Sequence, residues 1–229
     1  MALMIRGVIV DLDGTLIDSR RAHALAWKKT LDEEGVRNSL DEIERWMGCD
    51  VNQLLGQLAG VEAHSQRGQR LIQKKRRVLE AEYYHQIRPH PSSKALLSRL
   101  REEGLRFAFM TSANPCELKT FLNLLDSQEL MEYSKIEEVQ LKRRTPIETA
   151  IASLGMNPEE LVLLGNTPYD VQVAIGHGIS AIAFRSGGWS DGELTGAMMV
   201  YDDIPDLLRK FDESPLSKKA RGQIPLVAA

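Results

Sequence analysis

The stretch Gly7-Val8-Ile9-Val10-Asp11-Leu12-Asp13-Gly14-Thr15 decides the fold class. Its first four residues form a short apolar run, which is typical of a strand buried on both faces of a parallel sheet. Three similar runs follow, at residues 105–110, 161–164 and 179–184. Between them, apolar residues recur at helical spacing in segments 93–103, 147–154 and 168–175. This alternation predicts an α/β fold with a doubly wound, Rossmann-like parallel sheet.

Residues 20–88 interrupt the alternation of strands and helices. Apolar residues recur there at helical spacing, as in Leu54, Leu55 and Leu58, and no β-branched run occurs. We therefore predict an inserted all-helical domain at 20–88, with residues 1–19 and 89–213 forming the core. The basic run at 74–77 predicts a solvated helix face, with an anion-attracting surface as the alternative. Residues 214–229, with two prolines and mixed charge, are expected to form a peripheral C-terminal extension.

Composition restricts the classes of function. The 229 residues, 43% hydrophobic, can bury a sizeable core. No apolar run approaches the roughly 18–20 residues of a membrane span, and no signal peptide is expected, because the first residues lead directly into a strand. Two cysteines indicate a reducing compartment, hence the cytoplasm. A net charge of −3 leaves no global basic field that would attract nucleic acid, and the oligomeric state is left open.

Asp11 and Asp13 are the first candidates for chemistry. They follow a buried strand directly, and open α/β sheets bind ligands at the carboxyl ends of their strands. Of two such carboxylates, one can serve as a nucleophile or metal ligand while the other exchanges protons. Gly14 allows a sharp turn, and the Thr15 hydroxyl can steady a carboxylate or a phosphate. The alternative is a simple turn after a strand, but four specified residues match by chance only about once in 10⁵ positions.

The stretch continues as Leu16-Ile17-Asp18-Ser19, and in this form it resembles the first motif of the haloacid dehalogenase-like hydrolases, in the phosphoglycolate phosphatase-like branch. The resemblance extends over residues 5–211. It implies that Asp11 attacks phosphorus to form an aspartyl-phosphate and that Asp13 acts as general acid and then base. It also implies a Mg²⁺ site that uses Asp11 and the Asp13 carbonyl, which suits the preference of Mg²⁺ for hard oxygen ligands.

Two further segments resemble the phosphate-binding motifs of this family. Thr111-Ser112 closes the strand at 107–110, so hydroxyl and backbone N–H groups would face the same crevice as Asp11 and, with Thr15, hold the phosphate. Lys142 is the expected basic residue that bridges nucleophile and phosphate, with Arg143 in reserve, although the usual Lys-Pro-x-Pro pattern is absent. The alternatives are a helix N-cap at 111–112 and a surface cluster at 142–144.

The fourth motif is Gly165-Asn166-Thr167-Pro168-Tyr169-Asp170, which follows the strand at 161–164. The family form is Gly-Asp-x-x-x-Asp, in which the first acidic residue binds Mg²⁺. Here Asn166 takes that position, so an amide oxygen would replace a charged ligand. Asp170 is then expected to bind the metal directly or through water. We predict weaker Mg²⁺ affinity than in relatives that carry Asp.

The helical insert resembles the C1 cap of the family, a lid that excludes water and carries the specificity contacts. His23 lies twelve residues after Asp11 and is followed by Ala26-Trp27. The resemblance implies that His23 lies near the substrate and helps to orient the acid/base. The alternative is an ordinary helix residue.

The leading hypothesis is a Mg²⁺-dependent phosphatase that acts on a small phosphorylated metabolite through an aspartyl-phosphate. A catalytically weak module that binds phosphoesters or a protein is the alternative from another class, because of Asn166 and the missing Lys-Pro-x-Pro pattern. A phosphosugar mutase would share Asp11, Asp13 and His23. A 2-haloacid dehalogenase would accommodate Asn166, but Asp13 argues against it.

Overall fold

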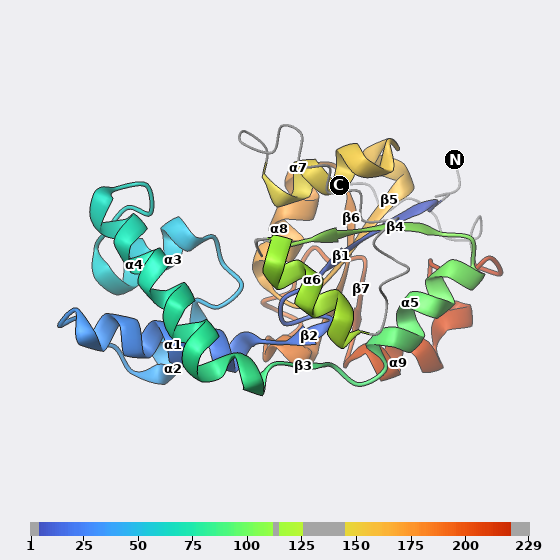
Figure 1. The fold of residues 1–229 in the computed structure, drawn as a ribbon. Helices are drawn as coiled ribbons and strands as arrows, with labels where there is room; N and C mark the ends of the chain where they lie inside the picture. The colour runs from blue at the N-terminus through green and yellow to red at the C-terminus, as the bar shows by residue number, and fades with distance from the viewer. Residues whose placement is uncertain (1–4, 112–114, 126–144, 221–229) are drawn as a thin grey trace. The chain divides into compact units, whose positions relative to one another are not determined.

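The computed structural model describes residues 5–111, 115–125 and 145–220 (Figure 1). The chain divides into two compact units, with boundaries between Ile17 and Asp18 and between Arg88 and Pro89. The larger unit is an α/β core and the smaller one is the segment between these two boundaries. None of the helices in the described ranges is long and apolar enough to cross a bilayer.

The core contains a five-stranded sheet in the order β4-β1-β5-β6-β7, and every pair of neighbouring strands is parallel. The strands are β1 (Gly7–Asp11), β4 (Arg106–Met110), β5 (Leu161–Gly165), β6 (Ser180–Phe184) and β7 (Met199–Tyr201). The first β-crossover leads from β1 to β4 on one side, and the chain then continues with β5 on the other side of β1. The predicted α/β class and parallel, doubly wound sheet are confirmed.

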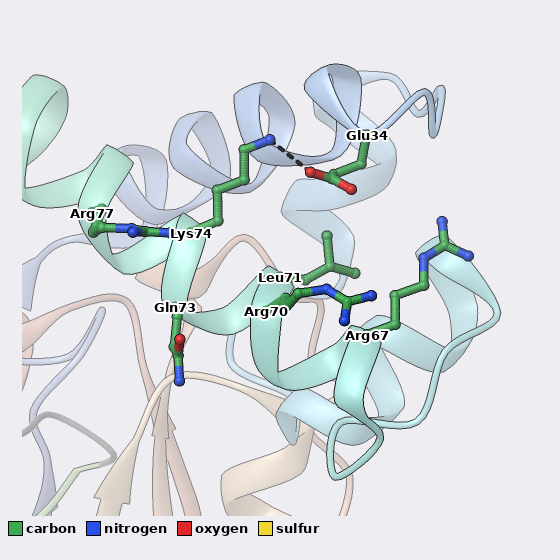
Figure 2. A pocket seen from close by; sticks show the side chains of 7 residues that line it. All are labelled: Glu34, Arg67, Arg70, Leu71, Gln73, Lys74 and Arg77. Atoms are coloured by element: carbon green, nitrogen blue, oxygen red, sulfur yellow. Dashed lines mark hydrogen bonds and ion pairs between the residues drawn. The ribbon is translucent and has the colours of Figure 1, made fainter.

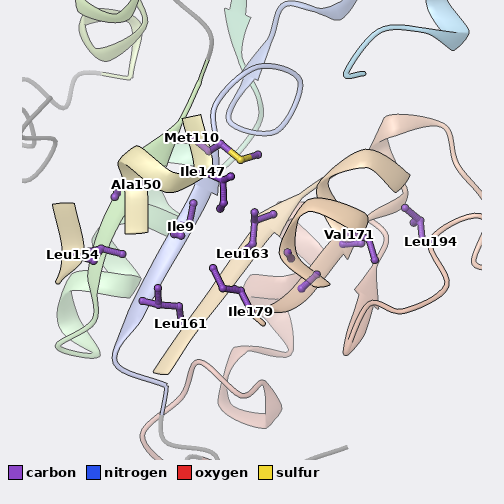
Figure 3. Packing of buried hydrophobic residues seen from close by; sticks show 14 residues of the cluster. Ile9, Met110, Ile147, Ala150, Leu154, Leu161, Leu163, Val171, Ile179 and Leu194 are labelled. Atoms are coloured by element: carbon purple, nitrogen blue, oxygen red, sulfur yellow. The ribbon is translucent and has the colours of Figure 1, made fainter. Parts of the chain in front are cut away.

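Helices cover both faces of this sheet. They are α5 (Ser93–Glu102), α6 (Pro115–Leu124), α7 (Pro146–Leu154), α8 (Pro168–Gly176) and α9 (Ile204–Arg209), with short 3₁₀ turns at Pro158–Glu160, Arg185–Gly187 and Phe211–Glu213. Figure 3 shows one face, where Ile9 and Leu163 pack against Ile147 of α7 and Val171 of α8. Alternate strand residues such as Phe107 point to the opposite face, and α5 and α9 contact β4 and β7 there.

Every regular element between Arg20 and Gln86, a range that the structure describes completely, is helical. The elements are α1 (Arg20–Glu33), α2 (Leu40–Arg45), α3 (Val51–Ala59), α4 (Gln66–Val78), a π-helical turn at Leu79–Tyr83 and a 3₁₀ turn at Tyr84–Gln86. Ser39 and Ser65 cap α2 and α4 by accepting hydrogen bonds from backbone N–H groups. The helices bury a core of their own that includes Leu31, Ile43 and Leu55. Two short strands, β2 (Ile17–Asp18) and β3 (Arg88–Pro89), pair where the chain leaves and rejoins the sheet.

The described part of the C-terminal extension, residues 214–220, packs onto the core. Leu216 and Ser217 are buried. The backbone N–H of Lys218 donates to Glu103 Oε2 at 2.7 Å, and its ammonium donates to the Glu102 carbonyl at 3.0 Å. The structure thus ties these residues to the C-terminal end of α5, because the buried Glu103 carboxylate needs donors.

Candidate active site

The parallel register brings three motif segments to one edge of the sheet. Asp11 ends β1 and lies opposite Met110, the last residue of β4, so Thr111 follows at the same level. On the other side, Val10 pairs with Leu164, which places Asn166 just beyond the end of β5. The carboxyl ends of three adjacent strands therefore carry the candidate side chains of the site.

The loop after β1 is a tight turn that holds two carboxylates. Gly14 has φ +84°, a left-handed conformation that side chains rarely adopt. The Thr15 hydroxyl donates to Asp11 Oδ2 at 3.1 Å, and the Thr111 hydroxyl donates to Asp13 Oδ2 at 3.0 Å. Each acid is therefore oriented by its own threonine. The structure brings together four predicted site residues, Asp11, Asp13, Thr15 and Thr111. The contacts of the two threonines with phosphate stay a prediction.

Burial and neighbouring charge set the electrostatics of Asp11. The pKa of its carboxyl is raised well above the usual value of 3.8, first by burial and then by the charges of Asp170 and Asp13. Hydrogen bonds from the Thr15 hydroxyl and the Leu12 backbone oppose this rise in pKa. Burial also raises the pKa of Asp170, to about 6, against hydrogen bonds from Thr167 and Asn166. The site thus concentrates carboxylates that repel one another.

Asn166 and Asp170 are fixed by hydrogen bonds of their own. Asp170 Oδ2 accepts from the Asn166 N–H at 3.0 Å, the Thr167 N–H at 2.9 Å and the Thr167 hydroxyl at 2.8 Å, in the capping box that begins α8. Gly165 leaves the room that this needs, because a Cβ there would lie 2.5 Å from Asp170 Cβ. Asn166 Nδ2 donates to the Gly14 carbonyl at 2.5 Å. This bond also sets which end of the Asn166 amide faces the loop.

The residues fit a Mg²⁺ ion, although they offer less charge than three clustered acids would. Within residues 5–111, 115–125 and 145–220, no three His, Cys, Asp or Glu side chains gather as a metal site. Asn166 Oδ1, however, is buried and has no hydrogen-bond partner among the described residues, and such an oxygen calls for a cation or a donor. With the Asp11 carboxylate, Asp170 and the Asp13 carbonyl, it would complete a set of hard oxygen ligands.

His23 lies in the helical insert, on α1. Its Nδ1 lies 2.7 Å from Lys75 Nζ. Because an ammonium can only donate, Nδ1 accepts and the proton of the neutral ring is on Nε2. Burial and then the charge of Lys75 hold the pKa of His23 well below 6.5. Lys75 also lies over the Trp27 ring, 5.8 Å from its centroid. The predicted role of His23 at the substrate stays a prediction.

Three predicted site residues, Ser112, Lys142 and Arg143, lie outside the described residues. Two residues that sequence reasoning did not assign do contact the site. His90 Nε2 lies 3.0 Å from the Gly14 carbonyl oxygen. The sequence feature that could have drawn attention to His90 is its position between Pro89 and Pro91. Gly187, after β6, packs so closely that a Cβ would lie 1.9 Å from the Asn166 carbonyl oxygen.

A separate pocket of about 180 Å³ lies in the insert, along α4. Figure 2 shows Arg67 and Arg70 side by side at one end and Lys74 directed toward Glu34, to which it donates at 2.7 Å. The pocket is positively charged, but Arg67 and Arg70 are exposed to solvent. It contains no acid pair of the kind found at Asp11 and Asp13. Of the basic run at 74–77, Arg76 and Arg77 are exposed, as a solvated helix face predicts, whereas Lys74 and Lys75 are half-buried.

Comparison with known proteins agrees with the geometry. A family model described as haloacid dehalogenase-like hydrolase matches residues 8–184. The chain belongs to the haloacid dehalogenase-like hydrolases. It is 27% identical to a phosphoglycolate phosphatase of Cereibacter sphaeroides, over 90% of this chain and 98% of that protein, and 30% identical to one of Nitrosospira multiformis, over 75% and 79%.

A solved structure extends the likeness to three dimensions. A hydrolase from Pseudomonas syringae superposes with a TM-score of 0.75 at 26% identity, covering 91% of this chain and 98% of that one. The predicted family, its phosphoglycolate phosphatase-like branch and the prediction of a phosphatase enzyme are confirmed.

Proposed function

We propose that the chain is a Mg²⁺-dependent phosphatase that hydrolyses a small phosphorylated metabolite through an aspartyl-phosphate on Asp11. The observation that carries this proposal is the acid pair at the end of β1, where Thr15 orients Asp11 and Thr111 orients Asp13. Two carboxylates with separate partners can take separate roles, one as nucleophile and one in proton transfer.

The reaction would proceed by two displacements at phosphorus. An Asp11 oxygen bonds to phosphorus while the ester P–O bond breaks, and Asp13 gives its proton to the departing alkoxide. Asp13 then takes a proton from water, whose oxygen bonds to phosphorus as the bond to Asp11 breaks. Phosphate leaves and Asp11 is a carboxylate again. Thr15, Thr111 and Ser112, with Lys142 or Arg143, would bind the equatorial phosphate oxygens.

Asp11, Asn166 and Asp170, with the Asp13 carbonyl, would hold Mg²⁺. When bound, the ion would neutralise the charge that these carboxylates place in the site, so that Asp11 stays ionised and a phosphate can approach. Two observations support this assignment: the raised pKa of Asp11, and Asn166 Oδ1, which has no hydrogen-bond partner in the part of the chain that the structure describes. Asn166 adds no charge, which supports the prediction of a lower Mg²⁺ affinity than in relatives that carry Asp at this position.

The substrate is proposed from the relatives. Both curated relatives described above are named phosphoglycolate phosphatases, so a short phosphorylated carboxylic acid is the first substrate to test. We further propose that the insert, residues 20–88, acts as the lid that selects the substrate, with His23 near the acid/base. The cytoplasmic location also stays a prediction.

The decisive experiment measures hydrolysis of an aryl phosphate, and of phosphorylated metabolites, with and without Mg²⁺. We expect Asp11→Asn to lose activity by about 1,000-fold or more. Asp18→Asn changes an exposed acid seven residues further on and serves as the matched control. The proposal fails if Asp11→Asn retains the wild-type rate, or if the wild type is as active without Mg²⁺ as with it.

The stereochemistry at phosphorus tests the covalent intermediate separately. Two in-line displacements retain the configuration of an isotopically chiral phosphate ester, whereas direct attack by water inverts it. A catalytically weak module is the second candidate, favoured by the uncharged Asn166 at a metal position. It predicts binding of phosphoesters with no turnover by the wild type. A phosphosugar mutase would transfer the phosphoryl group to a sugar hydroxyl faster than to water.

A further inference from the structure

We propose that His90 is a positioning residue for the catalytic loop, which we define as residues 11–17. The inference rests on the proposed function, since it assigns a role in the reaction of Asp11 and Asp13. His90 contacts the loop at two points. Its Nε2 lies 3.0 Å from the Gly14 carbonyl oxygen, and its backbone N–H donates to the Leu16 carbonyl at 2.9 Å.

The bond to Gly14 has one possible direction. A carbonyl oxygen only accepts, so His90 Nε2 carries the hydrogen. Asn166 Nδ2 donates to the same oxygen at 2.5 Å. The two lone pairs of the Gly14 carbonyl are therefore both used, one by the segment after β3 and one by the segment after β5.

The Leu16 carbonyl also accepts two hydrogen bonds, both from the segment that carries His90. The donors are the His90 N–H and the buried Ser93 hydroxyl, the latter at 2.9 Å. Thr15 lies between the two clamped carbonyls, and its hydroxyl donates to Asp11. Asp13 directly precedes Gly14. The fixed carbonyls thus flank the residue that orients the nucleophile and adjoin the acid/base.

The segment that carries His90 is itself stiff. Pro89 and Pro91 each have a fixed φ, and the residue before a proline is restricted to extended backbone. Ser92 follows with φ +66°, and no other described residue except glycine has a positive φ. A strained backbone of this kind persists where the surrounding structure holds it. The imidazole is therefore presented to Gly14 by a rigid support.

The consequence is a geometric requirement for catalysis. Without the His90 imidazole, Asn166 is the one remaining donor to the Gly14 carbonyl among the described residues. The turn at Gly14 can then tilt, which moves Asp13 and Thr15 together. A misplacement of about 1 Å at reacting groups costs on the order of 100-fold in rate. Because the fault lies in orientation at the transition state, kcat falls while KM changes little.

The experiment compares His90→Ala, His90→Asn and His90→Gln in steady-state hydrolysis of an aryl phosphate with Mg²⁺. Glutamine can place an N–H at the reach of Nε2, whereas asparagine is too short. We expect the Ala and Asn variants to lose about 10- to 100-fold in kcat, with KM within about threefold, and the Gln variant to recover most of kcat. His177→Ala is the matched control, since it removes a histidine bond to the Val173 carbonyl at the C-terminal end of α8. The kcat of this variant should not change.

Amide resonances of Asp13, Gly14 and Thr15 provide a readout that does not need turnover. We expect them to shift in His90→Ala and to return in His90→Gln. An inactive wild type with these shifts would overturn the proposed function and leave the positioning contact intact. An active wild type with unchanged kcat and unchanged resonances in His90→Ala would overturn the role of His90. Equal loss of kcat in His90→Gln and His90→Ala would overturn it too.

Discussion

Replacing Asn166 by Asp separates the two demands placed on this position. The amide donates Nδ2–H to the Gly14 carbonyl at 2.5 Å and leaves Oδ1 without a partner among the described residues. A carboxylate keeps an oxygen for Mg²⁺ but cannot donate to Gly14. It also adds a negative charge beside the acids that already raise the pKa of Asp11. We expect Asn166→Asp to be less stable than wild type without metal and to bind Mg²⁺ more tightly.

The magnitude follows from the contacts. Loss of the hydrogen bond to Gly14 costs about 1 kcal/mol, because the carbonyl still accepts from His90 and is not left unsatisfied. Asn166 is 3% exposed, and an unpaired carboxylate buried there adds about 2–3 kcal/mol. For a chain of this size, about 3–4 kcal/mol lowers Tm by about 6–16 °C.

The assay is thermal unfolding of both proteins in chelator and across a Mg²⁺ titration. Metal that binds only the folded state stabilises it by about 2.7 kcal/mol at 100 times its Kd. The Tm of Asn166→Asp should therefore start below wild type and rise more steeply. We expect half-saturation at a Mg²⁺ concentration about tenfold lower than in wild type, since one ligand gains a full charge.

Asn38→Asp is the matched control. Asn38 Nδ2 donates to the Leu58 carbonyl at 3.0 Å in the insert, so this variant loses a similar bond far along the chain from the acids. It should lose stability that Mg²⁺ does not restore. The reasoning is refuted if Asn166→Asp in chelator melts with the wild type, or if the two proteins share one Mg²⁺ half-saturation.

Three further predictions concern stability. The pKa of buried Asp170 is about 6 in the folded protein, above the unfolded value of about 3.9, so the folded metal-free protein binds this proton more readily. Protonated Asp170 therefore adds to the free energy of unfolding. This contribution is full below about pH 4 and is lost as pH rises through about 6. Guanidinium unfolding in chelator across this range should show that loss, and Asp170→Asn should flatten it; parallel curves would contradict the assignment. Gly187→Ala places a Cβ 1.9 Å from the Asn166 carbonyl oxygen and should cost about 3 kcal/mol in chemical denaturation, whereas Gly192→Ala, which has room, should be neutral. Ser92→Gly relieves about 1–2 kcal/mol of strain in the left-handed backbone at φ +66°, partly offset by the greater conformational freedom of glycine in the unfolded chain. We expect Tm to rise by about 1–4 °C, whereas Ser92→Ala should give no gain.

The core strands could be predicted because each is a short apolar run bounded by polar residues. Those expected at 105–110, 161–164 and 179–184 agree with β4, β5 and β6 to within one residue at each end. β7 was missed because it has only three residues, too few for a periodic pattern. β2 and β3 have two residues each and form a sheet only by pairing with one another. Neither dipeptide has a pattern from which a strand could be predicted.

The side chains at the sheet edge could also be predicted, because parallel strands place their carboxyl ends together. Thr111 and Asn166 are 55 residues apart in sequence, yet each follows a strand that neighbours β1. The hydrogen bonds could not be predicted. His90 reaches Gly14 across 76 positions of sequence, and no local pattern encodes a contact between an imidazole and one particular carbonyl.

Asp170 shows why a motif alone does not separate structural from chemical roles. Thr167-Pro168-Tyr169-Asp170 is a capping box with proline at the first helical position, which by itself explains an acid there. The three hydrogen bonds that the carboxylate accepts from described residues are all on Oδ2. A ligand role for Asp170 therefore depends on Oδ1, while capping fixes the direction in which that oxygen points. The same bonds hold the Asn166 N–H, so the box that starts α8 also orients the neighbouring amide. Capping is thus an observed role of this carboxylate and metal binding stays a proposed one, and a variant that tests the proposed role must preserve the capping, as Asp170→Asn does.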